Sequence, residues 1–94
     1  MKKNAFQARL SVAILKEGNR YIAFSPALDL STSGKTEREA KKRFVEAAQL
    51  FFEEITGAGT LERALGELGW KRAKSRWNPP MIVSQEAQTF TVPV

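Results

Sequence analysis

Length and composition limit this chain to one small domain and exclude several kinds of chemistry. It has 94 residues, a formal net charge of +5, and neither cysteine nor histidine. Without cysteine there is no disulfide, thiolate zinc site or cysteine nucleophile, and without histidine there is no imidazole base. Hydrophobic content of 43% and charged content of 27% are typical of a globular domain. We therefore expect a single domain over residues 1–94 that carries no cofactor.

The sequence contains no pattern typical of a membrane span or a secretion signal. Its apolar runs extend for only a few residues, whereas a spanning helix needs about 20. Two lysines occur near the start of the chain, but no apolar signal core follows them. We therefore expect a cytoplasmic protein that makes no membrane contact.

The first third of the chain predicts three antiparallel strands. Apolar residues occupy the even positions from Phe6 to Ile14, which is the period of a half-buried strand. Residues 16–20 contain Gly and Asn and predict a turn, after which Tyr21–Phe24 resumes the strand pattern. Beyond Pro26, a further alternation over residues 28–33 predicts a short third strand.

Two helices are expected to follow, and the start of the first is the clearest local signal. Thr36 and Glu39 have the spacing of a capping box, in which the Thr36 hydroxyl accepts from the Glu39 amide and the Glu39 carboxylate accepts from the Thr36 amide. An apolar helical stripe then continues to Gly57, where we expect the helix to end. Thr60 is the expected N-cap of a second helix that ends at Gly69. Because short isolated helices are unstable, both should pack on one face of the sheet.

The last quarter predicts a connection followed by a strand region. Residues 71–80 are basic, end in two prolines and show no period, so we expect a connection there. Residues 81–94 are strand-like, and Pro93, which lacks an amide donor, places the final segment at a sheet edge. The expected fold is therefore α+β, an antiparallel sheet in the order β-β-β-α-α-β with two helices on one face. Its core should span residues 5–70.

The acidic residues offer little support for catalysis. Most glutamates fall on the polar faces of the predicted helices, where solvation and ion pairing explain them. Asp29 is the only aspartate, and it lies between Ser25 and Ser31 without a second acid nearby. A turn role for Asp29 is therefore favoured over a metal-assisted catalytic one. We expect no enzyme activity and no metal site.

Most of the surplus positive charge lies after residue 70. Residues 71–94 contain four Lys and Arg against one acid. The candidate basic patch comprises Lys71, Arg72, Lys74, Arg76 and Trp77. Cations interleaved with aromatic residues are typical of nucleic-acid-binding surfaces, but four charges are few for tracking phosphates. A structural connection, or a patch that meets an acidic protein surface, is the favoured interpretation of this segment.

Several short motifs follow one another in a fixed order between residues 10 and 70. They are Tyr21–Leu30, Ser33–Thr36, Glu39–Ala40, Glu46–Ala47, Phe51–Glu54, Gly59–Leu61 and Leu65–Trp70. This succession resembles the HicB-like antitoxin family. The resemblance implies an α+β domain similar to a partial ribonuclease H fold, which binds and blocks a small RNA-cleaving HicA-type toxin. The toxin partner in that family is of the double-stranded-RNA-binding-domain type.

The resemblance also implies where a partner would bind. The implied contact region is the exposed part of the sheet together with the Ser25–Leu30 segment. Its candidate residues are Tyr21, Ser25, Pro26 and Asp29. Many family members continue into a DNA-binding domain, for which 94 residues leave no room, so autoregulation by that route is not expected.

Self-association is a further expectation, because an apolar last strand offers an open edge for pairing. We therefore expect a homodimer or a higher homo-oligomer. The alternative function is a stand-alone oligomeric binding protein of the same fold that contacts nucleic acid through residues 71–77.

Overall fold

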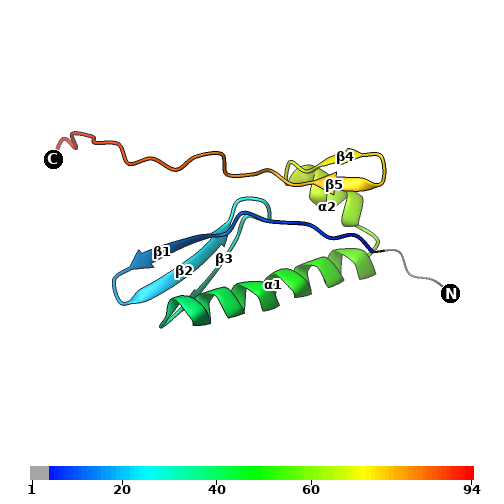
Figure 1. Cartoon of the computed structure of the whole chain (residues 1–94), viewed down its shortest axis with the longest axis horizontal. Coiled ribbons are helices and arrows are strands. Elements are labelled where there is room, and N and C mark those ends of the chain that lie inside the picture. Colours follow the sequence, from blue (N-terminus) through cyan, green and yellow to red (C-terminus); the bar gives the residue numbers. More distant parts are fainter. Residues whose placement is uncertain (1–4) are drawn as a thin grey trace.

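A computed structural model describes residues 5–94 as an α+β fold, which confirms the predicted fold class (Figure 1). The elements are β1 (Ala13–Glu17), β2 (Arg20–Ser25), β3 (Leu30–Gly34), α1 (Glu37–Gly57), α2 (Leu61–Glu67), β4 (Lys71–Ala73) and β5 (Arg76–Asn78). An antiparallel sheet in the order β1-β2-β3 is accompanied by a separate two-stranded sheet, β4-β5. Within residues 5–94, no helix has the length and apolar character needed to cross a bilayer.

The three-stranded sheet forms because two turns bring consecutive strands together. Gly18 has a φ of +60° in the turn that joins β1 to β2, a conformation that glycine adopts without steric cost. The turn from β2 to β3 has Asp29 at a φ of 49°, with its amide donating to the Pro26 carbonyl at 3.3 Å. Aspartate tolerates this left-handed conformation better than most residues. The predicted turn role of Asp29 is thus confirmed, and β2 lies at the centre of the sheet.

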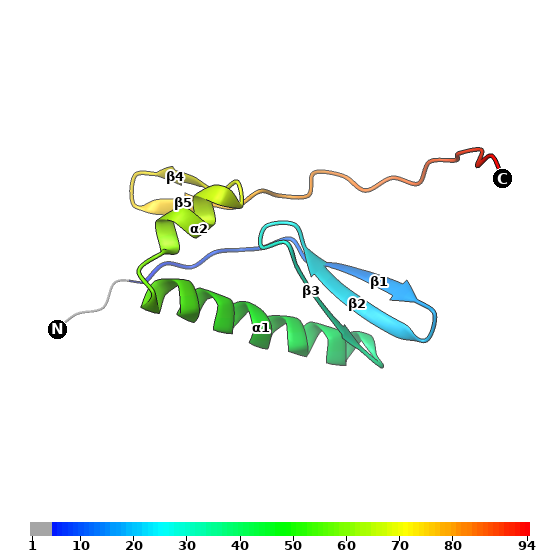
Figure 2. The same cartoon turned by 180° about the vertical axis from the view of Figure 1, so that it is seen from behind.

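One face of the sheet is covered by α1, which lies beneath it in both views (Figures 1 and 2). The close approach depends on small residues, since Ala23 of β2 and Ala40 of α1 are both fully buried. The Thr32 hydroxyl of β3 donates to the Ala40 carbonyl at 2.9 Å. At Gly34 a Cβ atom would lie only 2.6 Å from the Ala40 backbone nitrogen. Glycine is therefore required where β3 turns into the helix.

The core is closed by Trp70, which follows α2 and is 2% exposed. Its indole Nε1–H donates to the Ala27 carbonyl at 2.8 Å, across 43 residues of sequence. The Phe52 ring of α1 packs edge-on against the Trp70 ring at a centroid distance of 6.1 Å. Together with the fully buried Leu65 of α2, Trp70 ties the second helix to the turn between β2 and β3. The tryptophan therefore joins the end of the helical part to the sheet.

The predicted helix caps are partly correct. The Thr36 hydroxyl accepts from the Glu39 amide at 3.1 Å, as predicted. The Glu39 carboxylate, however, accepts from the Lys35 amide at 2.6 Å and not from Thr36. Thr60 is the N-cap residue of α2, as predicted, but its hydroxyl forms no cap bond. It donates instead to the carbonyl of Ile55, at 3.3 Å, in the last turn of α1.

Three predicted boundaries are also wrong. The first strand begins at Ala13 and not at Phe6, because the alternating segment before it has no neighbouring strand to pair with. Residues 71–80 contain the β4-β5 hairpin in place of a simple connection, with Lys74 supplying the left-handed turn at a φ of 59°. Residues 81–94 form no strand, and no backbone within the described part of this chain pairs with them. The element order is therefore β-β-β-α-α-β-β.

Candidate functional site

The turn between β2 and β3 holds three of the predicted contact residues, but only part of it is accessible. Ser25 is fully buried, and its Oγ accepts from the Ala27 amide at 3.3 Å. Ala27 and Leu28 fill the core. Pro26 is half-buried and Asp29 is exposed. The accessible part of this turn is therefore formed by Pro26 and Asp29, while Ser25 stabilises the turn from inside.

Tyr21, the fourth predicted contact residue, lies at the opposite end of β2. It pairs with Gly34 in the register of the sheet, and both residues lie on the face covered by α1. The Lys16 ammonium lies 5.7 Å from the centre of the Tyr21 ring, a cation–π distance. The structure therefore places Tyr21 away from the Pro26–Asp29 turn.

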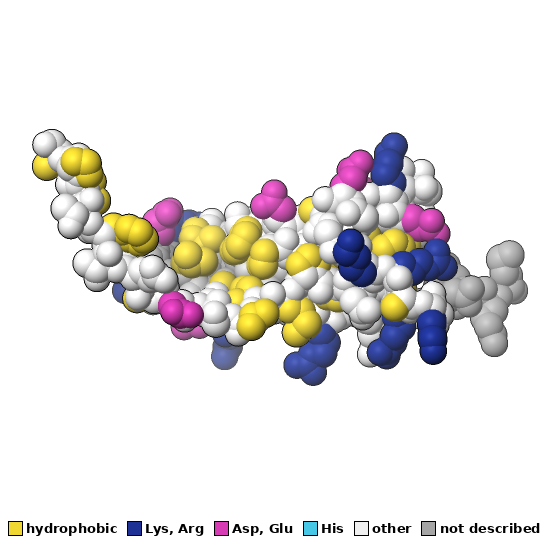
Figure 3. Space-filling model, turned by 90° about the horizontal axis from the view of Figure 1, so that it is seen from above, with side chains coloured by type: hydrophobic (Ala, Val, Ile, Leu, Met, Phe, Trp, Pro, Cys, Tyr) yellow, Lys and Arg dark blue, Asp and Glu magenta, His cyan; other side chains and the backbone are white. Residues whose placement is uncertain are grey.

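The face of the sheet opposite α1, which we call the outer face, carries apolar side chains that the sequence analysis did not single out. Strand alternation places Leu15, Ile22 and Phe24 on it, with Leu15 paired directly to Ile22. Leu15 is 49% exposed, and the other two are half-buried. Seen from above, hydrophobic side chains gather over the sheet (Figure 3). The sequence signal for this second apolar face was the unbroken apolar run Tyr21–Phe24 in β2. A strand with apolar side chains on both faces is typically covered on both faces.

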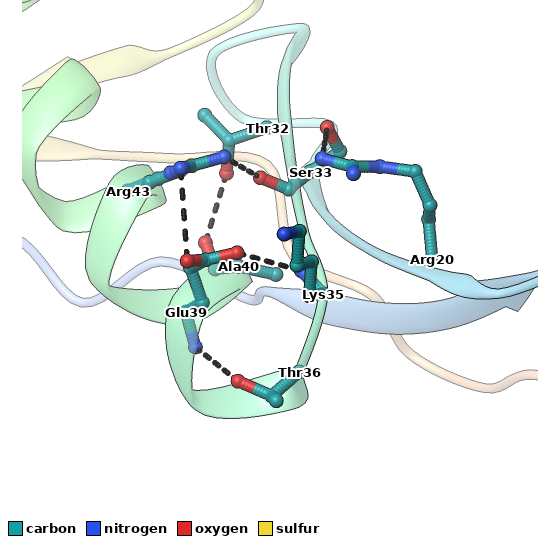
Figure 4. Close-up of polar contacts among 8 residues, drawn as sticks. All are labelled: Arg20, Thr32, Ser33, Lys35, Thr36, Glu39, Ala40 and Arg43. Carbon is teal, nitrogen blue, oxygen red and sulfur yellow. Dashed lines mark hydrogen bonds and ion pairs between the residues drawn. The ribbon is translucent and has the colours of Figure 1, made fainter.

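A polar cluster joins β3 to the start of α1 at one end of the sheet (Figure 4). The Arg43 guanidinium donates to the Ser33 carbonyl at 3.0 Å and lies 3.7 Å from the Glu39 carboxylate. Arg20 donates to the Ser33 hydroxyl at 3.2 Å. The backbone N–H of Lys35, followed by the nearby positive charges, lowers the pKa of Glu39 below its usual value. These contacts hold the strand end against the helix.

The β4-β5 hairpin displays the basic patch predicted from the sequence. Its residues are Lys71, Arg72, Lys74, Arg76 and Trp77. Arg72 pairs with Trp77 across the hairpin, and its guanidinium carbon lies 5.9 Å from the centre of the indole ring. The same guanidinium forms a 3.0 Å ion pair with Glu62 of α2. The structure thus brings all five residues together on one hairpin that Arg72 anchors to the helix.

An open groove of about 830 Å³ separates the hairpin from the N-terminal segment that precedes β1. Phe6 and Arg9 line one side, and Arg76, Trp77 and Pro79 line the other. The groove is therefore both aromatic and positively charged, which extends the basic patch beyond the residues predicted from the sequence. Arg9 was missed because 67 residues of sequence separate it from Arg76.

Neither a metal site nor a similar known protein indicates the function of this chain. Within residues 5–94, no group of three or more potential ligand side chains lies close enough to hold a metal ion. Comparisons with family models, with curated proteins and with solved structures found no match. The chain's candidate binding surfaces are therefore the outer face, the Pro26–Asp29 turn and the basic hairpin.

Proposed function

We propose that this chain is a HicB-like binding module that inactivates a small RNA-cleaving toxin of the HicA type by covering its active site. The observation that carries the proposal is the open outer face of a sheet that α1 supports from behind. Such a face can exclude RNA from a toxin without any chemistry by this chain. The mechanism is therefore occlusion by a rigid surface.

The residues that carry the family resemblance build this platform. Gly34 permits the close approach of β3 to α1, and Thr36 caps the helix. Ala40 packs against the sheet, and Trp70 closes the core through its bond to Ala27. Because these positions have structural roles, a chain that shares them is expected to share the platform. This supports a common fold and, through it, a common mode of binding.

The outer face has the composition of a protein-binding surface. Its centre is formed by the apolar residues Leu15, Ile22 and Phe24. Ser31 and Ser33 of β3 lie on the same face and add hydroxyl groups beside this centre. An apolar centre with polar surroundings is typical of protein interfaces, where a few central side chains supply most of the binding free energy.

Co-expression tests the proposal directly. The chain would be produced together with the protein encoded by the adjacent reading frame, which we expect to be small, basic and to contain histidine. A stable complex should co-purify, and the RNA cleavage of the partner should be suppressed in it. Failure to co-purify, with cleavage undiminished, would overturn the proposal.

A bulky substitution on the outer face tests where the partner binds. Ser31→Arg introduces a long charged side chain at an exposed strand position, so the fold should persist while the interface is obstructed. We expect at least a tenfold loss of affinity, about 1.4 kcal/mol. Gln49→Arg, at an exposed position of α1, is the matched control and should bind as the wild type does. Equal affinities of the two variants would contradict an interface on the outer face.

A second function, contact with nucleic acid through the hairpin, is favoured by one observation. Arg72 and Trp77 form a cation–π pair on an exposed hairpin that carries three further cations. Reversing Lys71, Lys74 and Arg76 to Glu leaves the anchoring Arg72–Glu62 ion pair in place. If this surface binds single-stranded nucleic acid, the variant should lose binding, and the wild-type affinity should fall with salt at a logarithmic slope of about −2.

A control with the same change of charge separates specific contact from general attraction. Arg38, Lys42 and Arg63 are exposed on the two helices and can likewise be reversed to Glu. That variant should retain binding if the hairpin is the contact surface. Equal loss in both variants would show that only net charge matters, and no retention of the wild type on RNA or DNA at low salt would exclude this function.

A further inference from the structure

Residues 79–94, which we call the C-terminal arm, extend away from the body of the protein. They contain no helix or strand and run in the same direction as β1, ending beyond its tip in both views (Figures 1 and 2). The Ile82 amide donates to the Ser11 hydroxyl at 3.3 Å and holds the beginning of the arm. Phe90 is 77% exposed and Val92 is 71% exposed. The arm therefore presents apolar side chains that this chain itself does not bury.

The dimensions of the chain show how unusual this exposure is. Its radius of gyration is 16.1 Å, whereas a compact chain of this length has about 12 Å. Its accessible surface is 7956 Å², which exceeds by about 2,500 Å² the area expected for a compact monomer of this mass. A standard protein interface buries about 800 Å² on each partner. The excess of the whole chain over a compact monomer is therefore larger than the area that one partner contributes to a standard interface.

The arm is almost uncharged, and this restricts what can bind it. Glu86 is its only charged residue, although charged residues make up 27% of the whole chain. An uncharged arm offers no phosphate contacts, so it does not fit nucleic acid. Its alternating residues Phe90, Val92 and Val94 fit the edge of a sheet, where main-chain hydrogen bonds supply affinity and alternate side chains enter an apolar surface.

An edge of this kind is present in the same chain. Because β2 is central, β1 and β3 are the edge strands. In the part of the chain that the structure describes, neither outer edge forms a backbone hydrogen bond with another segment. The Ser33 carbonyl of β3 is already bound by Arg43. The more accessible edge is therefore β1, where Leu15 also lies exposed on the outer face.

The arm cannot reach its own β1 with the apolar end. With Ile82 held beside Ser11, an extended chain places Thr89 about 23 Å further along the direction of β1. The strand itself ends at Glu17, about 20 Å beyond Ser11 at the same rise per residue. The segment from Thr89 to the end of the chain therefore lies past the strand of its own molecule and is available to a second copy.

We propose that two copies exchange their arms, so that residues 89–94 of each copy add to β1 of the other as a fourth strand. In this arrangement Phe90, Val92 and Val94 share one face of the added strand and pack beside Leu15. Pro93 falls at an alternate position, where its missing amide hydrogen points away from β1, as is usual for an edge strand. A single two-fold axis relates the two copies, so that each arm pairs with the β1 edge of the other copy. The outer face over β2 and β3 remains free.

Mass measurement on the purified chain tests the proposal. Sedimentation equilibrium at micromolar concentration should give twice the 10.5 kDa chain mass. Phe90→Glu/Val92→Glu, which alters the arm, and Leu15→Glu, which alters the receiving edge, should each shift the protein to monomer. Val45→Glu, on the exposed side of α1, is the matched control and should remain dimeric.

A mixture of the two disrupted proteins tests the exchange itself. The Leu15→Glu protein retains an intact arm, and the Phe90→Glu/Val92→Glu protein retains an intact receiving edge. Mixed in equal amounts, they should form a dimer in which one of the two contacts is restored, at a concentration higher than the wild type requires. Dimers that form in the mixture and in neither variant alone would demonstrate contact between arm and edge in different copies.

Several outcomes would overturn the arm exchange. A monomeric wild type would show that two copies do not exchange their arms. If both disrupted variants remain dimeric, the interface lies elsewhere on the chain. If the mixture fails to associate, the arm and the β1 edge do not contact each other. These measurements use the chain alone, so they are independent of whether it inactivates a toxin.

Discussion

Replacement of Gly34 by alanine should be among the most damaging single-atom additions to this fold. The new Cβ would lie 2.6 Å from the Ala40 backbone nitrogen and 2.9 Å from the Glu39 Cβ. Because the nearest atom belongs to the backbone, the first turn of α1 has to move. That movement also weakens the bond from the Ala40 amide to the Thr36 carbonyl, which is 3.0 Å long.

The cost follows from these contacts. Overpacking typically destabilises by about 1 to 3 kcal/mol, and a weakened hydrogen bond adds about 1 kcal/mol. We therefore expect Gly34→Ala to lower the free energy of unfolding by about 3 kcal/mol. For a domain of this length, that corresponds to a fall in Tm of about 12 to 24 °C.

The assay is urea unfolding followed by circular dichroism, with Gly66→Ala as the matched control. Gly66 lies in α2, and a Cβ there meets nothing within 4 Å. The same substitution should therefore raise stability by about 0.5 to 1 kcal/mol, since alanine favours a helix over glycine. A Gly34→Ala protein within 0.5 kcal/mol of the wild type, roughly the range of a neutral surface substitution, would refute the reasoning.

Three further predictions concern contacts described above, and each is measured by the same unfolding assay. Trp70→Phe removes the donor to the buried Ala27 carbonyl and should cost about 2 to 3 kcal/mol, since a buried acceptor is left unpaired. Thr36→Ala removes a helix cap and should cost about 1 kcal/mol, whereas Thr60→Ala, where no cap bond exists, should cost less. The lowered pKa of Glu39 makes its contribution complete above pH 4.5 and progressively lost as pH falls through the folded-state value, so Glu39→Gln should flatten this acid dependence.

Each of these predictions has its own contradicting result. Equal stability of the Thr36→Ala and Thr60→Ala proteins would contradict the difference between the two helix starts. A Trp70→Phe protein as stable as the wild type would show that the indole bond contributes nothing. If the free energy of unfolding falls identically at acid pH in the wild type and in Glu39→Gln, the Glu39 carboxylate does not contribute to this pH dependence.

The predictable part of the fold is the part in which local signals and tertiary contacts agree. The Thr36 cap and the apolar stripe that follows it place α1 at its observed position, from Glu37 to Gly57. The turn near Gly18 likewise places the first hairpin. In these segments the exposed cap and turn residues specify the same elements as the apolar residues that face the core.

The unpredicted part depends on neighbours that a sequence does not reveal. The alternation from Phe6 onward fits a strand, but a strand forms only where another backbone accepts its hydrogen bonds, and no described strand pairs with residues 6–12. The hairpin at residues 71–78 required Lys74 in a left-handed conformation, which a lysine does not signal.

The residues of the candidate surfaces were likewise predicted where they are close in sequence and missed where only the fold brings them together. The five basic residues were identified because they are adjacent in sequence, and the structure gathers them on one hairpin. The exposed part of the sheet was expected as a contact region, but its apolar residues were missed because Leu15 and Phe24 come together only through the register of β1 and β2. Arg9 joins the basic groove for a similar reason, since its neighbour across the groove is distant in sequence.

The bond from Trp70 to the Ala27 carbonyl lies where the core-forming part of the chain ends and the part that supplies most of its free surface begins. Every residue of the buried core lies at or before Trp70, and beyond it the half-buried Trp77 packs against that core. The hairpin and the arm come after it and contribute surface. Substitutions there, at exposed positions other than Arg72 and Trp77, can change charge, partner choice or assembly while the folded body stays unchanged. The Trp70 indole bond thus lies at the boundary between the residues that stabilise the fold and the residues that can adapt its surface to a partner.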